Sequence, residues 1–137
     1  MRDYIFHGKR KYDDEWIEGC LIHQGDHYLI LQDESKLHPM DVSYIDEFGC
    51  IDGRADPVIP ESVGQYTGMK DKNGRKIFEG DIVKLLLVDG VEIGIIKFDN
   101  INCRFMFYDK SGGYGFDDTC VFEVIGNVFE NADLLEG

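Results

Sequence analysis

The dipeptide Asn73-Gly74 is the strongest local constraint on how this chain folds. A two-residue type I′ turn needs positive φ at both central residues, and asparagine and glycine tolerate that conformation best. Charged residues flank the dipeptide on both sides and keep the turn in water. Ile77-Phe78 begin an apolar return, and after the break at Glu79-Gly80-Asp81 an almost continuous apolar run covers residues 82–88. These patterns predict a tight hairpin followed by a buried strand.

Short apolar runs separated by turn residues continue through most of the chain. The clearest case is a hairpin in which the apolar runs 16–22 and 27–32 flank the turn Gln24-Gly25-Asp26. A meander of antiparallel strands is expected in the second half, with a flexible loop before its last strand and a final helical turn capped by Asn131. The expected strands are residues 77–88, 91–98, 102–108 and 120–129, and the loop is residues 110–119.

We therefore expect a mainly β protein. Short strands with tight turns favour a small SH3-like barrel in the C-terminal half, because closure removes exposed sheet edges. That barrel is expected to pack with an N-terminal β-hairpin lobe, giving one domain with two lobes, residues 1–60 and 61–137, and short helical turns. Residues 33–62 hold all three prolines and predict either a functional loop or a linking segment anchored by apolar side chains.

Two stretches 61 residues apart share one pattern. In each, an apolar pair precedes Glu-Gly and an apolar strand follows. Trp16-Ile17 precede Glu18-Gly19, and Ile77-Phe78 precede Glu79-Gly80. Two explanations account for this: a duplicated β unit, or convergence on the same turn-and-bulge geometry, in which glycine provides a bend.

The chain is strongly acidic, with a formal net charge of −13 from 14 basic and 27 acidic residues. Nucleic-acid binding requires cations that neutralise phosphates, so a direct role on DNA or RNA is disfavoured, although Lys9-Arg10-Lys11 leaves room for a local basic patch. The charge also opposes binding to anionic membranes. One alternative use of the charge is mimicry of DNA in order to occupy a host protein. The plainer interpretation is the ordinary acidity of cytoplasmic bacterial proteins.

The cysteines indicate a reducing compartment. Cys20, Cys50, Cys103 and Cys120 are too widely separated for a CxxC metal or redox motif. The sequence begins directly with folded-looking residues rather than a secretion signal, and no apolar run approaches transmembrane length. We therefore expect a cytoplasmic protein with reduced, partly buried thiols.

Few residues suggest a reaction. His23 and His27 flank the first hairpin turn near Cys20 and are weak candidates for a metal site, because no fourth ligand is marked. Asp13-Asp14-Glu15 and Asp117-Asp118 offer neighbouring carboxylates, but such groups in loops are usually solvated turn residues. No common catalytic or phosphate-binding motif occurs. We expect no catalytic residue and no cofactor, with a metal-dependent hydrolase as the alternative.

Aromatic residues in or beside loops are the remaining candidates for function. In an SH3-like barrel such side chains can line a groove for extended peptides, although at least half of them are expected to be core residues. Residues 105–108 are apolar on both faces of one strand, so the first half or another subunit would cover the spare face. We therefore expect a protein-interaction module that forms a homo-oligomer or binds another protein. The candidate partner-binding residues are Tyr66, Tyr108, Tyr114 and Phe116.

Four ordered segments of the chain also carry a family resemblance. The most distinctive is residues 65–83, QYTGMKDKNGRKIFEGDIV, and it resembles the signature of the YopX family, small proteins of bacteriophages and prophages. Residues 6–23, 57–68 and 123–135 resemble the family's opening segment, its run into the signature and its closing strand. His7 stands where the opening segment is expected to have arginine. The resemblance implies a mainly β fold and a phage or prophage origin, and it supplies no catalytic or ligand-binding residues.

Overall fold

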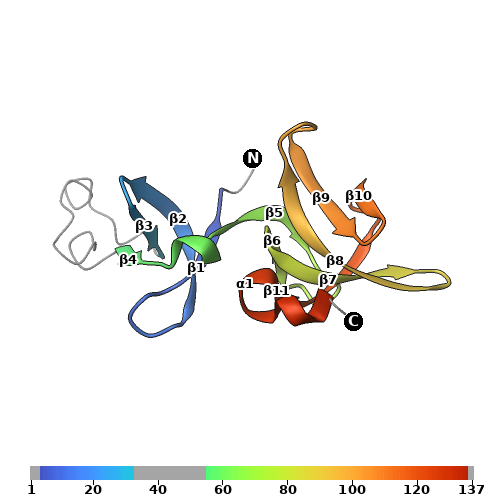
Figure 1. The fold of residues 1–137 in the computed structure, drawn as a ribbon, viewed down its shortest axis with the longest axis horizontal. Helices are drawn as coiled ribbons and strands as arrows, with labels where there is room; N and C mark the ends of the chain where they lie inside the picture. Colours follow the sequence, from blue (N-terminus) through green and yellow to red (C-terminus); the bar gives the residue numbers. More distant parts are fainter. Residues whose placement is uncertain (1–3, 33–54, 136–137) are drawn as a thin grey trace. The chain divides into compact units, whose positions relative to one another are not determined.

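The structure is a computed structural model that describes residues 4–32 and 55–135 (Figure 1). The chain divides into two units, residues 1–65 and 66–137, and the expected boundary at residue 60 lies slightly earlier. In the described residues the regular structure is mostly antiparallel strand with one short α-helix, which confirms the mainly β fold. Most of the expected linking segment, residues 33–54, lies outside the described residues.

The first unit is organised around the predicted hairpin at Gly25-Asp26. The hairpin strands pair so that Gln24 lies opposite His27 and Cys20 lies opposite Leu31. In spatial order the sheet runs β4, β3, β2, β1 and the first residues of β5. Its elements are β1 (Phe6–Lys9), β2 (Trp16–Gln24), β3 (His27–Leu31), β4 (Ala55–Pro57), the 3-10 turn η3 (Pro60–Ser62) and β5 (Gly64–Lys70).

Both faces of this first sheet bury apolar side chains. Successive residues of a strand point to opposite faces, so the apolar run of β3 serves both. Leu29 and Leu31 pack against Ala55 on one side, while Ile30 packs against Ile17 and Val58 on the other. The described residues of this unit therefore form two small apolar clusters, one on each face of the sheet.

The two Glu-Gly pairs of the proposed repeat have different structural roles. Gly19 lies inside β2, and a Cβ there would overlap the carbonyl oxygen of Leu31 on the neighbouring strand. Gly80 lies in the turn between β6 and β7, where it adopts a φ of +93°. One glycine allows a close approach between strands and the other allows a turn. This difference favours convergence over duplication.

The second unit consists of a five-stranded antiparallel sheet and a hairpin that covers one face of it. The hairpin is formed by the end of β5 and β6 (Lys76–Phe78). The predicted meander is confirmed by the pairing of Ile82 with Ile95 and of Ile96 with Phe107. In spatial order the strands are β10 (Gly112–Gly115), β9 (Arg104–Asp109), β8 (Gly90–Asp99), β7 (Asp81–Leu87) and β11 (Val121–Asn127).

The covered face of the five-stranded sheet holds the core of the second unit. Ile77 of the hairpin packs there against side chains from four strands of the sheet. The ring of Phe107 lies 5.9 Å from that of Phe122, measured between centroids. The buried members of this core are Ile77, Val83, Ile96, Phe107, Phe122 and Val124.

The end of the chain differs from the sequence prediction. Strand β11 ends at Asn127, where α1 (Val128–Asn131) begins and leads into the 3-10 turn η4 (Ala132–Leu135). Asn127, not Asn131, is the N-cap, since its side chain accepts a hydrogen bond from the Glu130 N–H at 2.9 Å. Asn131 has a different role: its side-chain oxygen accepts a hydrogen bond from the Asn127 N–H.

Part of the expected flexible loop is also a strand. Gly112–Gly115 form β10, which pairs with β9 in spite of its glycines. Within the described residues, β10 and β11 lie at opposite ends of the strand order and no pairing joins them. The expected SH3-like barrel therefore stays a prediction.

The hairpin at Asn73-Gly74 forms, but its turn is not the expected type I′. Gly74 has a φ of +82°, whereas Asn73 has no positive φ. The Gly74 N–H donates to the Asp71 carbonyl at 3.0 Å, and the Asp71 N–H donates to the Arg75 carbonyl at 2.7 Å. This is a three-residue loop with glycine in the left-handed position. The cause is the Asp71 carboxylate, whose Oδ1 accepts from the N–H groups of Asn73 and Arg75, both at 2.9 Å.

The same carboxylate fixes the hairpin to strand β11. Asp71 is only 7% exposed, and its Oδ2 accepts from the Val124 N–H at 3.0 Å. Next to it, the Lys72 N–H donates to the Phe122 carbonyl at 2.9 Å. Burial alone would raise the pKa of Asp71, but the three backbone N–H donors outweigh burial and hold the pKa below its usual value. The turn thus covers part of the outer edge of β11.

Asp71→Asn is expected to destabilise the second unit by roughly 2–3 kcal/mol, because one backbone N–H then loses its acceptor in a buried site. Urea unfolding followed by circular dichroism measures this change. The matched control is Asp118→Asn, an exposed residue of the same unit, which should stay within about 0.5 kcal/mol of the unmodified protein. Equal stabilities of the two variants would contradict the role assigned to Asp71.

Candidate functional site

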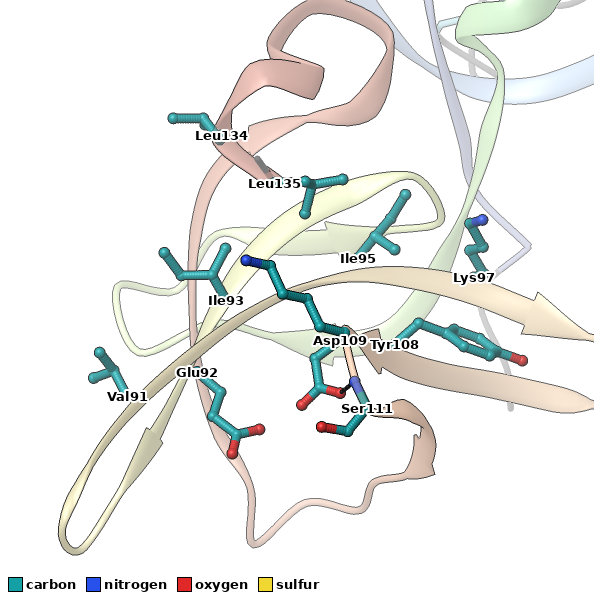
Figure 2. A pocket seen from close by; sticks show the side chains of 11 residues that line it. Val91, Glu92, Ile93, Ile95, Lys97, Tyr108, Asp109, Ser111, Leu134 and Leu135 are labelled. Carbon is teal, nitrogen blue, oxygen red and sulfur yellow. Dashed lines mark hydrogen bonds between the residues drawn. The ribbon is translucent and has the colours of Figure 1, made fainter. Parts of the chain in front are cut away.

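A groove of about 600 Å³ lies on the second unit, on the sheet face opposite the core (Figure 2). Its walls come from β8, from the end of β9 and the residues after it, and from η4. The volume lies in the range of ligand sites in proteins. The lining residues are Val91, Glu92, Ile93, Ile95, Lys97, Tyr108, Asp109, Lys110, Ser111, Leu134 and Leu135.

Strand alternation explains the floor of the groove. Val91, Ile93 and Ile95 are two residues apart along β8, so their side chains share one face of the sheet. The strand register places Tyr108 opposite Ile95. The Tyr108 ring extends over Gly113, where a Cβ would approach the ring to 2.5 Å. A glycine in β10 therefore leaves room for an aromatic rim beside an aliphatic floor.

The aliphatic side chains of the groove remain open to solvent. Val91 is 56% exposed, Ile93 is 41% exposed and Leu134 is 38% exposed. Isolated exposed aliphatic residues are common, but these three gather around one cavity. Figure 2 shows Leu134 and Leu135 on one side of this space and Ile93 on the other. A clustered apolar surface of this kind is typical of an interaction site.

Two carboxyl groups border the groove region from the other face of the sheet, because Glu92 and Asp109 alternate with the residues of the aliphatic floor (Figure 2). The Ser111 N–H donates to Asp109 Oδ1 at 2.7 Å. The neighbouring Asp109 carboxyl is the main reason that the pKa of Glu92 is raised, and burial and the charge of Asp89 add to the effect. The same interaction lowers the pKa of Asp109. The pair therefore holds one proton more readily than two separate carboxylates would.

The comparison with known families concerns nearly the whole chain. The family model described as YopX protein matches residues 8–136. The chain belongs to the YopX family. No curated protein sequence matches it. Both units of this YopX-family chain lie almost entirely within the match, and so does every residue of the groove.

The metal site suggested by His23 and His27 does not assemble in this YopX-family chain. In the hairpin register His23 lies opposite Tyr28, while His27 lies opposite Gln24. The two imidazoles therefore belong to opposite faces of the sheet. His23 instead stacks on the Tyr28 ring at 4.0 Å and lies 3.0 Å from the Gly25 carbonyl oxygen. Among residues 4–32 and 55–135, no group of three potential metal ligands is found.

The acidic clusters of the first unit serve as structural partners of one arginine. Arg10 pairs with Asp13, Glu15 and Asp56, which raises the pKa of its guanidinium, mainly through Asp13. Tyr12 completes the cluster by donating to Asp56 at 2.8 Å. Arg10 is thus engaged by carboxylates, which weakens the interpretation of Lys9-Arg10-Lys11 as a basic patch.

The carboxylate of Asp117 is also used locally. It accepts from the N–H of Thr119 at 2.9 Å and from the hydroxyl of the same residue. These bonds hold the pKa of Asp117 below its usual value. An acceptor fixed in a turn is the expected role of such a residue.

The four candidate aromatic residues separate into two groups. Tyr66 is 7% exposed and packs on Phe78, and Phe116 packs edge-to-face on Phe122 at 5.2 Å, so both belong to the core. Tyr108 lines the groove, and Tyr114 is exposed on β10. Partner binding by Tyr108 and Tyr114 stays a prediction. The residues that sequence reasoning missed are Val91, Ile93 and Glu92, although the apolar alternation from residue 91 onward carried a signal for the first two.

The three described cysteines differ in their exposure. Cys20 and Cys120 are half-buried, whereas Cys103 is exposed, contrary to expectation, because it lies in the turn before β9. Cys50 lies outside the described residues. In the part of the chain that the structure describes, no helix is long and apolar enough to cross a membrane.

The most perturbed carboxyl of the second unit is Asp81, which does not line the groove. Asp81 is 3% exposed, and its Oδ2 accepts from the Phe78 N–H at 2.8 Å in the turn between β6 and β7. Burial raises the pKa of Asp81 to about 7, more than this hydrogen bond lowers it. Perturbed acids often mark catalytic clefts. Here the buried position and the backbone partner indicate a structural role.

Asp81→Asn is expected to change the pH dependence of stability. A carboxyl whose pKa is raised by folding stabilises the protein while protonated, and this contribution is lost as the pH rises from about 4 to about 7. The asparagine variant lacks that loss, so its stability relative to the unmodified protein should increase by roughly 2–3 kcal/mol between pH 5 and pH 8. Urea unfolding at both pH values tests this, with Asp118→Asn as a control whose difference stays constant. Parallel curves for Asp81→Asn would contradict the raised pKa.

Proposed function

We propose that this YopX-family protein is a non-enzymatic protein-interaction module and that the groove on its second unit is the docking surface. The observation that carries the proposal is the gathering of three exposed aliphatic side chains, Val91, Ile93 and Leu134, around one cavity. Covering these side chains with a partner removes apolar surface from water, at about 25 cal/mol per Å². Tyr108 at the rim adds an amphipathic ring of the type enriched at protein interfaces.

The side chains that were candidates for catalysis have local structural roles, and this supports a non-enzymatic function. Asp13 is paired with Arg10, and Asp117 accepts from Thr119. His23 and His27 lie on opposite faces of their hairpin. A metal-dependent hydrolase would require these groups to converge on a shared position. Protein binding requires only the surface that the groove offers.

The partner we propose is another protein of the phage or of its host cytoplasm. A second copy of the chain is the other candidate, consistent with the expectation of a homo-oligomer. Each copy carries a formal charge of −13, so two copies repel each other over a distance of roughly 10 Å at 0.1 M salt. The acidic surface therefore favours a partner that is less negative than this chain.

Site-specific photo-crosslinking in cells that express the full chain tests the docking surface. A photoreactive residue at position 93, in place of Ile93, should give a discrete adduct with one protein. The matched control places the same residue at position 101, because Ile101 is 90% exposed in the same unit but does not line the groove.

The adduct from position 93 should disappear when Leu134→Asp is added, because that charge lies in the opposite wall of the groove. Circular dichroism shows whether the doubly changed chain stays folded. An adduct of twice the chain mass would identify a second copy as the partner. No adduct at position 93, or the same adducts from both positions, would refute the groove as a docking surface.

A further inference from the structure

Strand β10 is the last strand on its side of the five-stranded sheet. Among the described residues, β9 is the strand with which it pairs, and all four of its residues are exposed. The backbone N–H and C=O groups on the far side of such a strand are directed away from the sheet and can pair with an added strand. This edge is therefore a surface at which an extended segment of another protein can bind.

Two side chains of β9 lie over β10 on the groove face of the sheet. The Tyr108 ring covers Gly113, and Arg104 covers Gly115, where a Cβ would lie 2.4 Å from a guanidinium nitrogen. The strand register and the alternation along β9 place both side chains on the face that holds Ile95. Because the two glycines carry no side chains, the ring and the guanidinium extend across β10 toward its outer edge.

The positive charge of Arg104 is available to a partner. Asp99 lies opposite Arg104 in the strand register, but its carboxylate accepts hydrogen bonds from the Ile101 N–H at 3.1 Å and from the Asn102 amide. The ion pairs found among residues 4–32 and 55–135 do not include Arg104. A carboxylate on an added strand would meet this guanidinium beside Gly115. The net charge of −13 opposes further carboxylates in the partner segment.

The other face of β10 offers an aromatic contact. Tyr114 lies opposite Phe107, so its side chain is on the face that holds the core, yet it is 48% exposed. An apolar residue of an added strand would cover this ring and remove apolar surface from water.

We propose that β10 is extended by an antiparallel strand of a partner protein, with a carboxylate opposite Gly115 and an aromatic residue opposite Gly113. Residues that share a face are two apart, so the partner sequence is glutamate or aspartate, then an aliphatic residue that packs on Tyr114, then an aromatic residue that packs on Tyr108. A second copy of β10 fits less well, because Gly112–Gly115 contain no carboxylate. The strand adjoins the groove at Tyr108, but its binding does not depend on the groove.

Peptide titration of the full chain, followed by NMR, tests the proposal. The probe is the acetylated and amidated peptide STVEVYVTS, compared with STVQVYVTS. Both should shift the amide signals of residues 113–115, and the glutamate peptide should bind about three-fold more tightly, the value of one exposed ion pair. Two N-methylated forms of the glutamate peptide, methylated at alternate residues, test backbone pairing. The form methylated on the edge that faces β10 should lose binding, and the other form should keep it.

Arg104→Gln should remove the three-fold preference and keep the affinity for STVQVYVTS. Lys97→Gln is the matched control, since Lys97 is an exposed cation on the same face of the sheet but on β8, and it should keep the preference. Equal binding of the two peptides by the unmodified chain would overturn the assigned role of Arg104. Equal effects of the two methylation patterns would overturn strand addition. Shifts at Ile93 without shifts in β10 would place the peptide in the groove, which would overturn this inference and support the docking groove.

Discussion

The buried carboxylate of Asp71 is the interaction on which the second unit depends. Its two oxygens accept three backbone N–H groups, two within its own turn and one from Val124, which is 53 residues away in the sequence. The hairpin of β5 and β6 is short, and a two-stranded hairpin alone is at best marginally stable in water. Fixed to β11 by Asp71, it places Ile77 over the core of the five-stranded sheet. A local turn and a long-range contact are thus made by one side chain.

The position of the groove follows from this arrangement. The hairpin covers one face of the five-stranded sheet, so the other face is left to the C-terminal turns, which are too short to cover all of it. Leu134 and Leu135 reach part of β8, and the space beside them is the groove. Tyr108 borders this space because Gly113 leaves room for its ring. The proposed interaction surface is therefore the part of the sheet that the chain itself does not cover.

Local patterns predicted the strands well and the side-chain chemistry poorly. Apolar alternation and turn residues were enough for the β2–β3 hairpin and for the meander from β7 to β9. The turn at Asn73-Gly74 was assigned to the wrong type because its geometry is set by the Asp71 carboxylate, which accepts hydrogen bonds from backbone N–H groups of the loop. Residue propensities do not show where a side chain points. Strand β10 was missed because its glycines resemble a flexible loop, whereas pairing with β9 is a tertiary contact. The effect of Asp109 on the pKa of Glu92 depends on strand register, which composition does not reveal.

The two outer strands of the five-stranded sheet differ in how they can associate. An uncovered edge presents unpaired backbone groups and can recruit another strand. On β11, Lys72 and Asp71 already bond to Phe122 and Val124, so that edge is partly closed. Among the residues that the structure describes, the short β10 is the more open edge of this sheet. Strand pairing between two copies at β10 would leave the partly closed β11 at both ends of the joined five-stranded sheets, which disfavours further growth of this sheet toward a fibre.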